Sequence, residues 1–129
     1  MLNLAHKKLD VYKIAFELIK EIYVLTKYFP PEEKYGIVSQ LRRAAVSVCS
    51  NIAEGCARKS KQEKKRFFEI SRSSVVEIDT QIQISLVIGY LKQEQVGVLE
   101  NYLERIFMMI CKMIEKLNAI SESPKSKDA

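Results

Sequence analysis

A run of basic side chains near the middle of the chain is the feature of the sequence best suited to chemistry with a partner. Between Arg58 and Arg66 the sequence holds six cations and a single acid, Glu63. The cations are Arg58, Lys59, Lys61, Lys64, Lys65 and Arg66. Clustered Lys and Arg attract phosphate backbones through counterion release, and the amides at a helix N-terminus also favour anions. The run therefore predicts RNA or DNA binding, with Arg42 as a further contributor.

The same run has a plainer interpretation, in which it only forms a solvated surface. Lysine at the start of a helix opposes the helix dipole, and charge runs commonly serve solubility alone. The formal net charge is +5, and this stretch accounts for all of it, so the rest of the chain nets to zero. No aromatic platform or base-reading element is visible in the sequence. Any binding is therefore expected to be largely independent of base sequence.

Catalytic chemistry finds little support in the sequence. The only histidine, His6, lies in the N-terminal segment, and the Glu-x-x-His motif of di-iron bundles is absent. Glu54 and Glu77 are candidates for an acid/base pair, but two carboxylates on a bundle are more often caps or ion-pair partners. The four glycines form no phosphate-cradling loop. We therefore predict no enzyme activity, no metal site and no cofactor.

Cysteine usage and hydropathy indicate a cytoplasmic protein without a membrane partner. Cys49, Cys56 and Cys111 follow neither zinc nor redox spacing, and all three lie in helical patterns. No stretch of about 18 uncharged apolar residues occurs, and residues 1–8 lack the features of a secretory signal.

Four helices must position these side chains. Apolar residues recur at three- and four-residue steps over about 10–28, 31–54, 61–90 and 93–120. The predicted core stripes are Val11, Ala15, Leu18, Ile22 and Leu25 in the first helix, Phe67, Ile70, Ser74, Ile78, Ile82 and Ser85 in the third, and Leu99, Leu103, Ile106, Ile110, Met113 and Leu117 in the fourth. Short connections make successive helices antiparallel. The fold predicted is all-α, an antiparallel up-down-up-down four-helix bundle over residues 1–121, followed by a disordered tail at 122–129.

Local signals mark the helix ends. Pro30 and Pro31 separate the first two helices, with Pro31 in the first turn of the second. Gly55 is predicted to close the second helix in the left-handed conformation. Ser60 and Glu63 then form a capping box that starts the third.

The second and third helices carry too few charges for a lone bundle. Between Ile37 and Ala57 only Arg42, Arg43 and Glu54 are charged, and residues 73–91 hold only Glu77 and Asp79. One interpretation is that small and hydroxyl residues are tolerated at the surface. The other is that these two helices also form the interface of a homo-oligomer.

Polar residues at heptad-like spacing accompany this apolar surface and form a predicted oligomer seam. They are Arg43, Ser47, Asn51 and Glu54 in the second helix, and Glu77 and Gln81 in the third. Such residues can fix register and partner number. Arg43 and Glu77 either pair with each other there or remain solvated.

The chain resembles the 23S rRNA intervening sequence proteins, also labelled S23 ribosomal proteins, in the segment 40–55, QLRRAAVSVCSNIAEG. The resemblance extends to LDVY at 9–12, FPPEEKYG at 29–36 and GYL at 89–91, and so covers essentially the whole folded chain. It differs in Cys49, where many relatives have proline, and in Ser73, where many have glycine.

This resemblance implies a small helical bundle, and several members are encoded within insertions in ribosomal RNA genes. Relatives that accompany the reverse transcriptases of diversity-generating retroelements are pentameric barrels with basic surfaces that bind nucleic acid. Residues and resemblance together favour a non-catalytic homo-oligomer, a pentamer by resemblance, that binds RNA or DNA through the basic run. The rival hypothesis is a scaffold that binds a protein partner and no nucleic acid.

Overall fold

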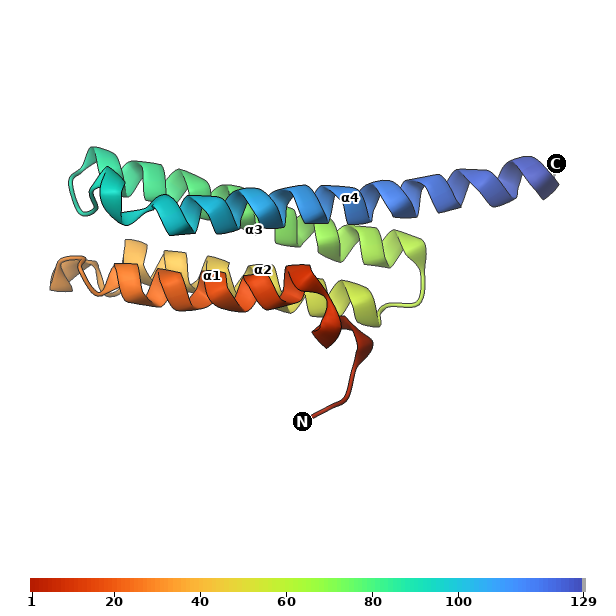
Figure 1. Ribbon diagram of the computed structural model, residues 1–129, viewed down its shortest axis with the longest axis horizontal. Helices are drawn as coiled ribbons and strands as arrows, with labels where there is room; N and C mark the ends of the chain where they lie inside the picture. The colour runs from red at the N-terminus through yellow and green to blue at the C-terminus, as the bar shows by residue number, and fades with distance from the viewer. Residues whose placement is uncertain (129) are drawn as a thin grey trace.

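Four long helices, joined by short turns, form the antiparallel bundle that the sequence predicts (Figure 1). The computed structural model describes the backbone of residues 1–128 and the side chains of residues 1–119. The helices are α1 (Asp10–Thr26), α2 (Ile37–Ala57), α3 (Lys61–Val87) and α4 (Gly97–Asp128). Each helix packs against two neighbours, in the order α1, α2, α3, α4 around the bundle, and α2 and α3 share the most extensive contact. The sequence predicts a disordered tail at 122–129. The side chains of these residues and the backbone of residue 129 lie outside the described part, so the tail stays a prediction.

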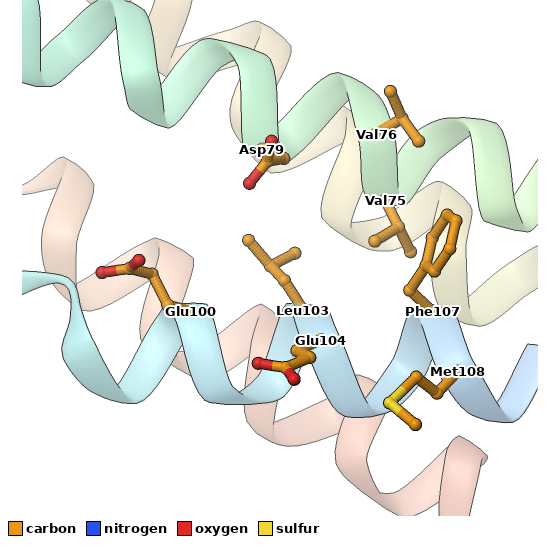
Figure 2. Close-up of a pocket in the computed structure, with 8 residues that line it drawn as sticks. All are labelled: Val75, Val76, Asp79, Glu100, Leu103, Glu104, Phe107 and Met108. Atoms are coloured by element: carbon orange, nitrogen blue, oxygen red, sulfur yellow. The ribbon is translucent and has the colours of Figure 1, made fainter.

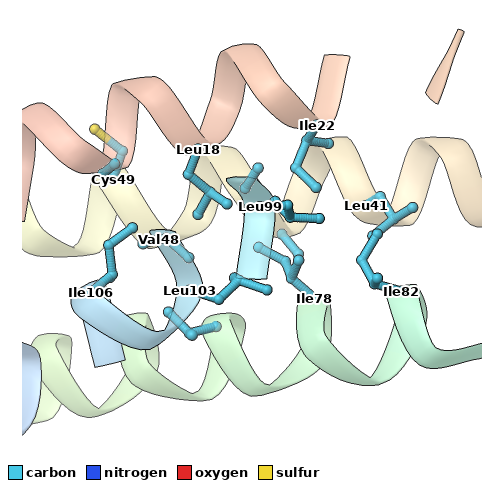
Figure 3. Packing of buried hydrophobic residues seen from close by; sticks show 14 of the residues in the cluster. Leu18, Ile22, Leu41, Val48, Cys49, Ile78, Ile82, Leu99, Leu103 and Ile106 are labelled. Atoms are coloured by element: carbon cyan, nitrogen blue, oxygen red, sulfur yellow. The ribbon is translucent and has the colours of Figure 1, made fainter. Parts of the chain in front are cut away.

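The core is a single apolar cluster that runs along the bundle axis (Figure 3). All five residues of the predicted α1 stripe are buried, as are Leu99, Leu103, Ile106 and Ile110 of α4. The predicted α3 stripe is wrong at its start, because Phe68 and Ser71 are buried while Phe67 is half-buried and Ile70 is exposed. Ser71 reaches α2 there, and its hydroxyl donates to the carbonyl of Val48 at 2.7 Å.

Two helix boundaries of α2 differ from the prediction. Pro31 starts a separate 3-10 turn, Pro31–Glu33, and α2 begins only at Ile37. Gly55 does not close α2, which continues to Ala57. A Cβ atom at Gly55 would lie 2.5 Å from Cε1 of Phe68, so this glycine allows close approach of α3.

The start of α3 agrees with the prediction, whereas α1 ends at Thr26, α3 ends at Val87 and α4 begins at Gly97, each two to four residues inside the predicted spans. The amide of Glu63 donates to Ser60 Oγ at 3.1 Å, which confirms the Ser60 half of the predicted capping box. Gly89 has a φ of 87°, and the amide of Tyr90 donates to the carbonyl of Ser85 at 2.9 Å. These contacts form the left-handed turn that ends α3 and redirects the chain toward α4.

Candidate nucleic-acid interface

The basic run forms the turn between α2 and α3 and the first two turns of α3. Arg58 makes an ion pair with Glu54 of α2, with 2.9 Å between Nη2 and Oε2. Its guanidinium carbon also lies 4.7 Å from the centre of the Phe67 ring, and that of Arg66 lies 5.6 Å from the same ring. The half-buried Phe67 ring therefore holds two guanidinium groups near one another at the surface.

Lys64 has a structural role within this run. Its ammonium donates to the carbonyl of Cys56 at 3.1 Å and to that of Gly55 at 3.5 Å. These carbonyls belong to the last turn of α2, where a cation also interacts favourably with the helix dipole. Burial raises the pKa of the Cys56 thiol, and the nearby Lys64 partly offsets that rise. Lys64 thus joins the two helices that flank the turn.

The remaining lysines of the run are free to meet an anion. In the described part of the chain, the side chains of Lys59, Lys61 and Lys65 make no hydrogen bond or ion pair. Lys61 and Lys65 lie four residues apart on α3 and therefore share one face of the helix.

Folding adds further cations to this end of the molecule. The N-terminal segment, the α2–α3 turn and the later turns of α4 lie in the same half of the bundle (Figure 1). Residues 1–16, 50–72 and 108–119 make up that half, and they hold twelve Lys and Arg against five Asp and Glu, a net charge of +7. The opposite half, residues 17–49 and 73–107, holds seven cations against nine acids, a net charge of −2. The bundle is therefore polarised along its axis.

Arg42 lies apart from the basic run. Arg42 lies sixteen positions before Arg58, about 24 Å along the helix axis. Its Nε donates to Thr26 Oγ1 at 3.0 Å, and its guanidinium carbon lies 4.4 Å from the centre of the Tyr23 ring. The two predicted parts of the nucleic-acid site are therefore not brought together.

Several residues of the predicted seam form hydrogen bonds inside the chain. The hydroxyls of Ser47 on α2 and Ser74 on α3 lie 2.9 Å apart. Asn51 donates to the carbonyl of Ser47 at 2.9 Å and to its hydroxyl at 3.0 Å. These small residues let α2 and α3 pack closely, which accounts for part of the missing charge on both helices. Whether they also meet a second copy stays a prediction.

The rest of the seam lies along the same line between α2 and α3. Gln81 donates to Gln40 Oε1 at 3.1 Å and to Glu77 Oε1 at 3.2 Å. Arg43 and Glu77 line one recess of about 390 Å³, yet in the described part of the chain no ion pair joins them. The sequence gives no sign that Ser71 is buried. Its hydrogen bond to α2 follows only from how α2 and α3 are aligned in the fold.

A second groove, between α3 and α4, has a different character (Figure 2). It has a volume of about 380 Å³, the buried Val75 and Leu103 form its apolar floor, and the exposed Val76, Phe107 and Met108 border it. Its carboxylates come from both helices and are Asp79, Glu100 and Glu104. In Figure 2 the acidic side chains gather toward one end of the groove and the Phe107 ring toward the other.

These features define an antiparallel four-helix bundle with a cationic end. The family model of the 23S rRNA-intervening sequence protein matches residues 7–112, which is most of the chain. The chain belongs to this family. No curated protein matched the chain in a search.

A solved structure supports the same fold. The crystal structure of a protein with unknown function from the S23 ribosomal protein family of Bacteroides thetaiotaomicron VPI-5482 superposes with a TM-score of 0.74. The two chains are 21% identical, and the match covers 81% of this chain and 97% of that one. In the described part of this chain, no helix is long and apolar enough to cross a membrane.

Proposed function

We propose that this protein is a non-catalytic, oligomeric accessory protein of the cytoplasm that binds RNA or DNA through phosphate contacts at the α2–α3 end. The observation that carries the proposal is the net charge of +7 in the half of the bundle that holds this turn, against −2 in the other half. A field polarised in this way orients an approaching polyanion toward one end of the molecule.

The contacts at that end suit backbone binding. Lys59, Lys61 and Lys65 are not used in ion pairs within the described residues, so pairing with phosphate breaks no existing bridge. Arg58 and Arg66 add planar donors beside Phe67. Lysine contacts to phosphate release counterions without distinguishing bases, so affinity should depend on salt more than on sequence.

Oligomerisation is part of the proposal, with a second copy of the chain as the occupant of an exposed apolar surface on α3. The exposed side chains are Ile70, Val76, Ile84, Val87 and Ile88. Several exposed apolar side chains along one helix are typical of a protein interface. A ring of copies, five by family resemblance, would repeat the cationic end and raise the avidity for a long polyanion.

A labelled RNA of about 20 nucleotides, titrated with the full-length chain and followed by fluorescence anisotropy, tests the nucleic-acid part. At about 50 mM salt we expect binding, and at about 200 mM salt a loss of affinity by an order of magnitude or more. Absence of binding even at the lower salt concentration contradicts the proposal.

The second candidate function is a protein-interaction scaffold without nucleic-acid binding. The α3–α4 groove favours it, because an apolar floor bordered by Asp79, Glu100 and Glu104 suits a basic amphipathic helix. Absence of RNA binding together with self-association would support this candidate instead.

A further inference from the structure

A groove that we call the α1–α2 groove runs along one side of α2, from Val38 to Asn51, and Tyr23 is the residue that lines it from α1. It has a volume of about 700 Å³, within the range of about 300–1,000 Å³ that ligand pockets occupy. Its lining includes three cations, Lys34, Arg42 and Arg43. Among its lining residues, all within the described part of the chain, there is no Asp or Glu. The groove is therefore cationic although its half of the bundle carries a net charge of −2.

Two tyrosines border these cations. Tyr35 is 88% exposed, and Tyr23 is 41% exposed. The Lys34 ammonium lies 5.4 Å from the centre of the Tyr35 ring, and the Arg42 guanidinium carbon lies 4.4 Å from that of Tyr23. The sequence separates Tyr23 from Arg42 by 19 positions, so only the antiparallel packing of α1 and α2 reveals that this ring and this guanidinium lie together. The sequence alone did not indicate this grouping.

Arg42 is held in place before any ligand arrives. Its Nε donates to Thr26 Oγ1, which in turn donates to the carbonyl of Ile22 at 2.7 Å. Thr26 is buried, so this chain of bonds anchors the guanidinium at the floor of the groove. The bond to Thr26 uses one of the five N–H donors of Arg42. Its two terminal amino groups keep the planar arrangement that suits phosphate.

We infer that the α1–α2 groove binds unpaired nucleotides of a single-stranded nucleic acid, with a base stacked on Tyr35 and the adjoining phosphate on Arg42 and Arg43. Proteins that bind single strands combine cations that follow the backbone with aromatic rings on which bases stack. A duplex keeps its bases stacked inside and offers none to Tyr35. This inference rests on the proposed function and deepens it, since it names the form of nucleic acid that the protein prefers.

The lining of the groove argues against an amphipathic helix as its occupant. Only Val38 and Val46 supply aliphatic surface, and Val38 is itself buried. Ser39, Ser50 and Asn51 supply most of the remaining lining and suit hydrogen bonds to bases or sugars.

The test compares a 12-nucleotide RNA without self-complementarity with the same strand annealed to its complement. Both are labelled and titrated by anisotropy against the full chain and three variants, Tyr35→Ala, Tyr35→Phe and Tyr28→Ala. Tyr28 is the matched control, because it is 65% exposed and does not line the groove. Circular dichroism confirms that each variant is folded.

We expect Tyr35→Ala to weaken single-strand binding about tenfold while duplex binding changes less than twofold. Tyr35→Phe and Tyr28→Ala should both retain the wild-type affinities. Arg43→Gln should lower the salt dependence of single-strand binding by about one phosphate contact.

Unchanged single-strand affinity in Tyr35→Ala overturns the inference. If a Lys59→Gln/Lys65→Gln variant then still weakens both ligands, the proposed function stands without the groove. If that double variant also changes neither affinity, the proposed function fails as well. A labelled oligoglutamate peptide that binds the wild type and loses affinity in Tyr35→Ala would assign the groove to an acidic protein segment and so also overturn the inference.

Discussion

Single residues decide how closely α2 and α3 pack, and Gly55 shows this best. In the middle of a helix, glycine costs about 1 kcal/mol relative to alanine, so propensity alone favours a substitution. The Cβ contact of 2.5 Å with the Phe68 ring opposes it, because overpacking a core costs about 1–3 kcal/mol. Phe68 is buried and has little room to move, so we expect the steric cost to be the larger of the two.

Gly55→Ala should therefore lower the melting temperature by several degrees, measured by thermal circular dichroism. Gly97→Ala is the control, because a Cβ atom there meets nothing within 4 Å. A Gly55→Ala protein as stable as the wild type would show that α3 can shift away from α2 without cost.

Cys49 offers a second test at the residue scale. Burial raises the pKa of its thiol to about 11, so at pH 8 the reactive thiolate is scarce in the folded protein. In a protein whose other two cysteines are replaced by serine, Cys49 should react with Ellman's reagent far more slowly in the native state than in urea. Equal rates in the two states would mean that the thiol is not buried.

At the scale of elements, the α2–α3 turn holds two kinds of cation, those that stabilise the fold and those that are free to bind a partner. The two kinds look alike in the sequence, because Lys64 and Lys65 are adjacent members of one run. Only the turn geometry shows that Lys64 reaches back to the last carbonyls of α2.

Lys64→Gln should consequently reduce the free energy of unfolding by about 1 kcal/mol, through the lost charged hydrogen bond to the end of α2. Lys65→Gln removes the same charge one residue away and should leave stability within about 0.5 kcal/mol of the wild type. Urea denaturation of both proteins measures the difference. Equal stabilities of the two variants would show that Lys64 has no structural role.

Sequence periodicity predicted the elements well, and their contacts poorly. The stripes of α1 and α4 followed from spacing, since each of these helices buries one apolar face. The start of α3 did not, because it packs against α2 through Ser71, which the predicted stripe left out as polar. Gly55 was likewise taken for a helix end because close approach of another helix leaves no local signal.

At the scale of the whole molecule, the exposed apolar residues of α3 predict self-association. Light scattering should give a mass that is a multiple of the 14.9 kDa chain at micromolar concentration. An Ile84→Lys/Val87→Lys variant should shift toward one chain, since both side chains are exposed and their loss leaves the core intact. Gln83→Lys is the control for added charge alone. A mass of one chain for the wild type would contradict the prediction.

The polarised charge of the molecule also lay beyond the sequence. The basic run accounts for the net charge of +5, and that much was visible. The antiparallel order of the helices then brings the N-terminal lysines and those of α4 to the same end as the run, so the net charge of that half of the bundle is +7. The place of Arg42 beside Tyr23 depends in the same way on the packing of α1 against α2.

The claim that nucleic acid binds at the α2–α3 end is tested most directly by the salt dependence of RNA affinity in two matched double variants. Lys59→Gln/Lys65→Gln removes two free cations from the α2–α3 end, and Lys27→Gln/Arg105→Gln removes two exposed cations from the opposite half. We expect the first variant to lose roughly tenfold in affinity near 100 mM salt, with a slope reduced by about two phosphate contacts, and the second to match the wild type. Equal losses in the two variants would mean that RNA senses only the net charge and that the α2–α3 end is not the binding surface.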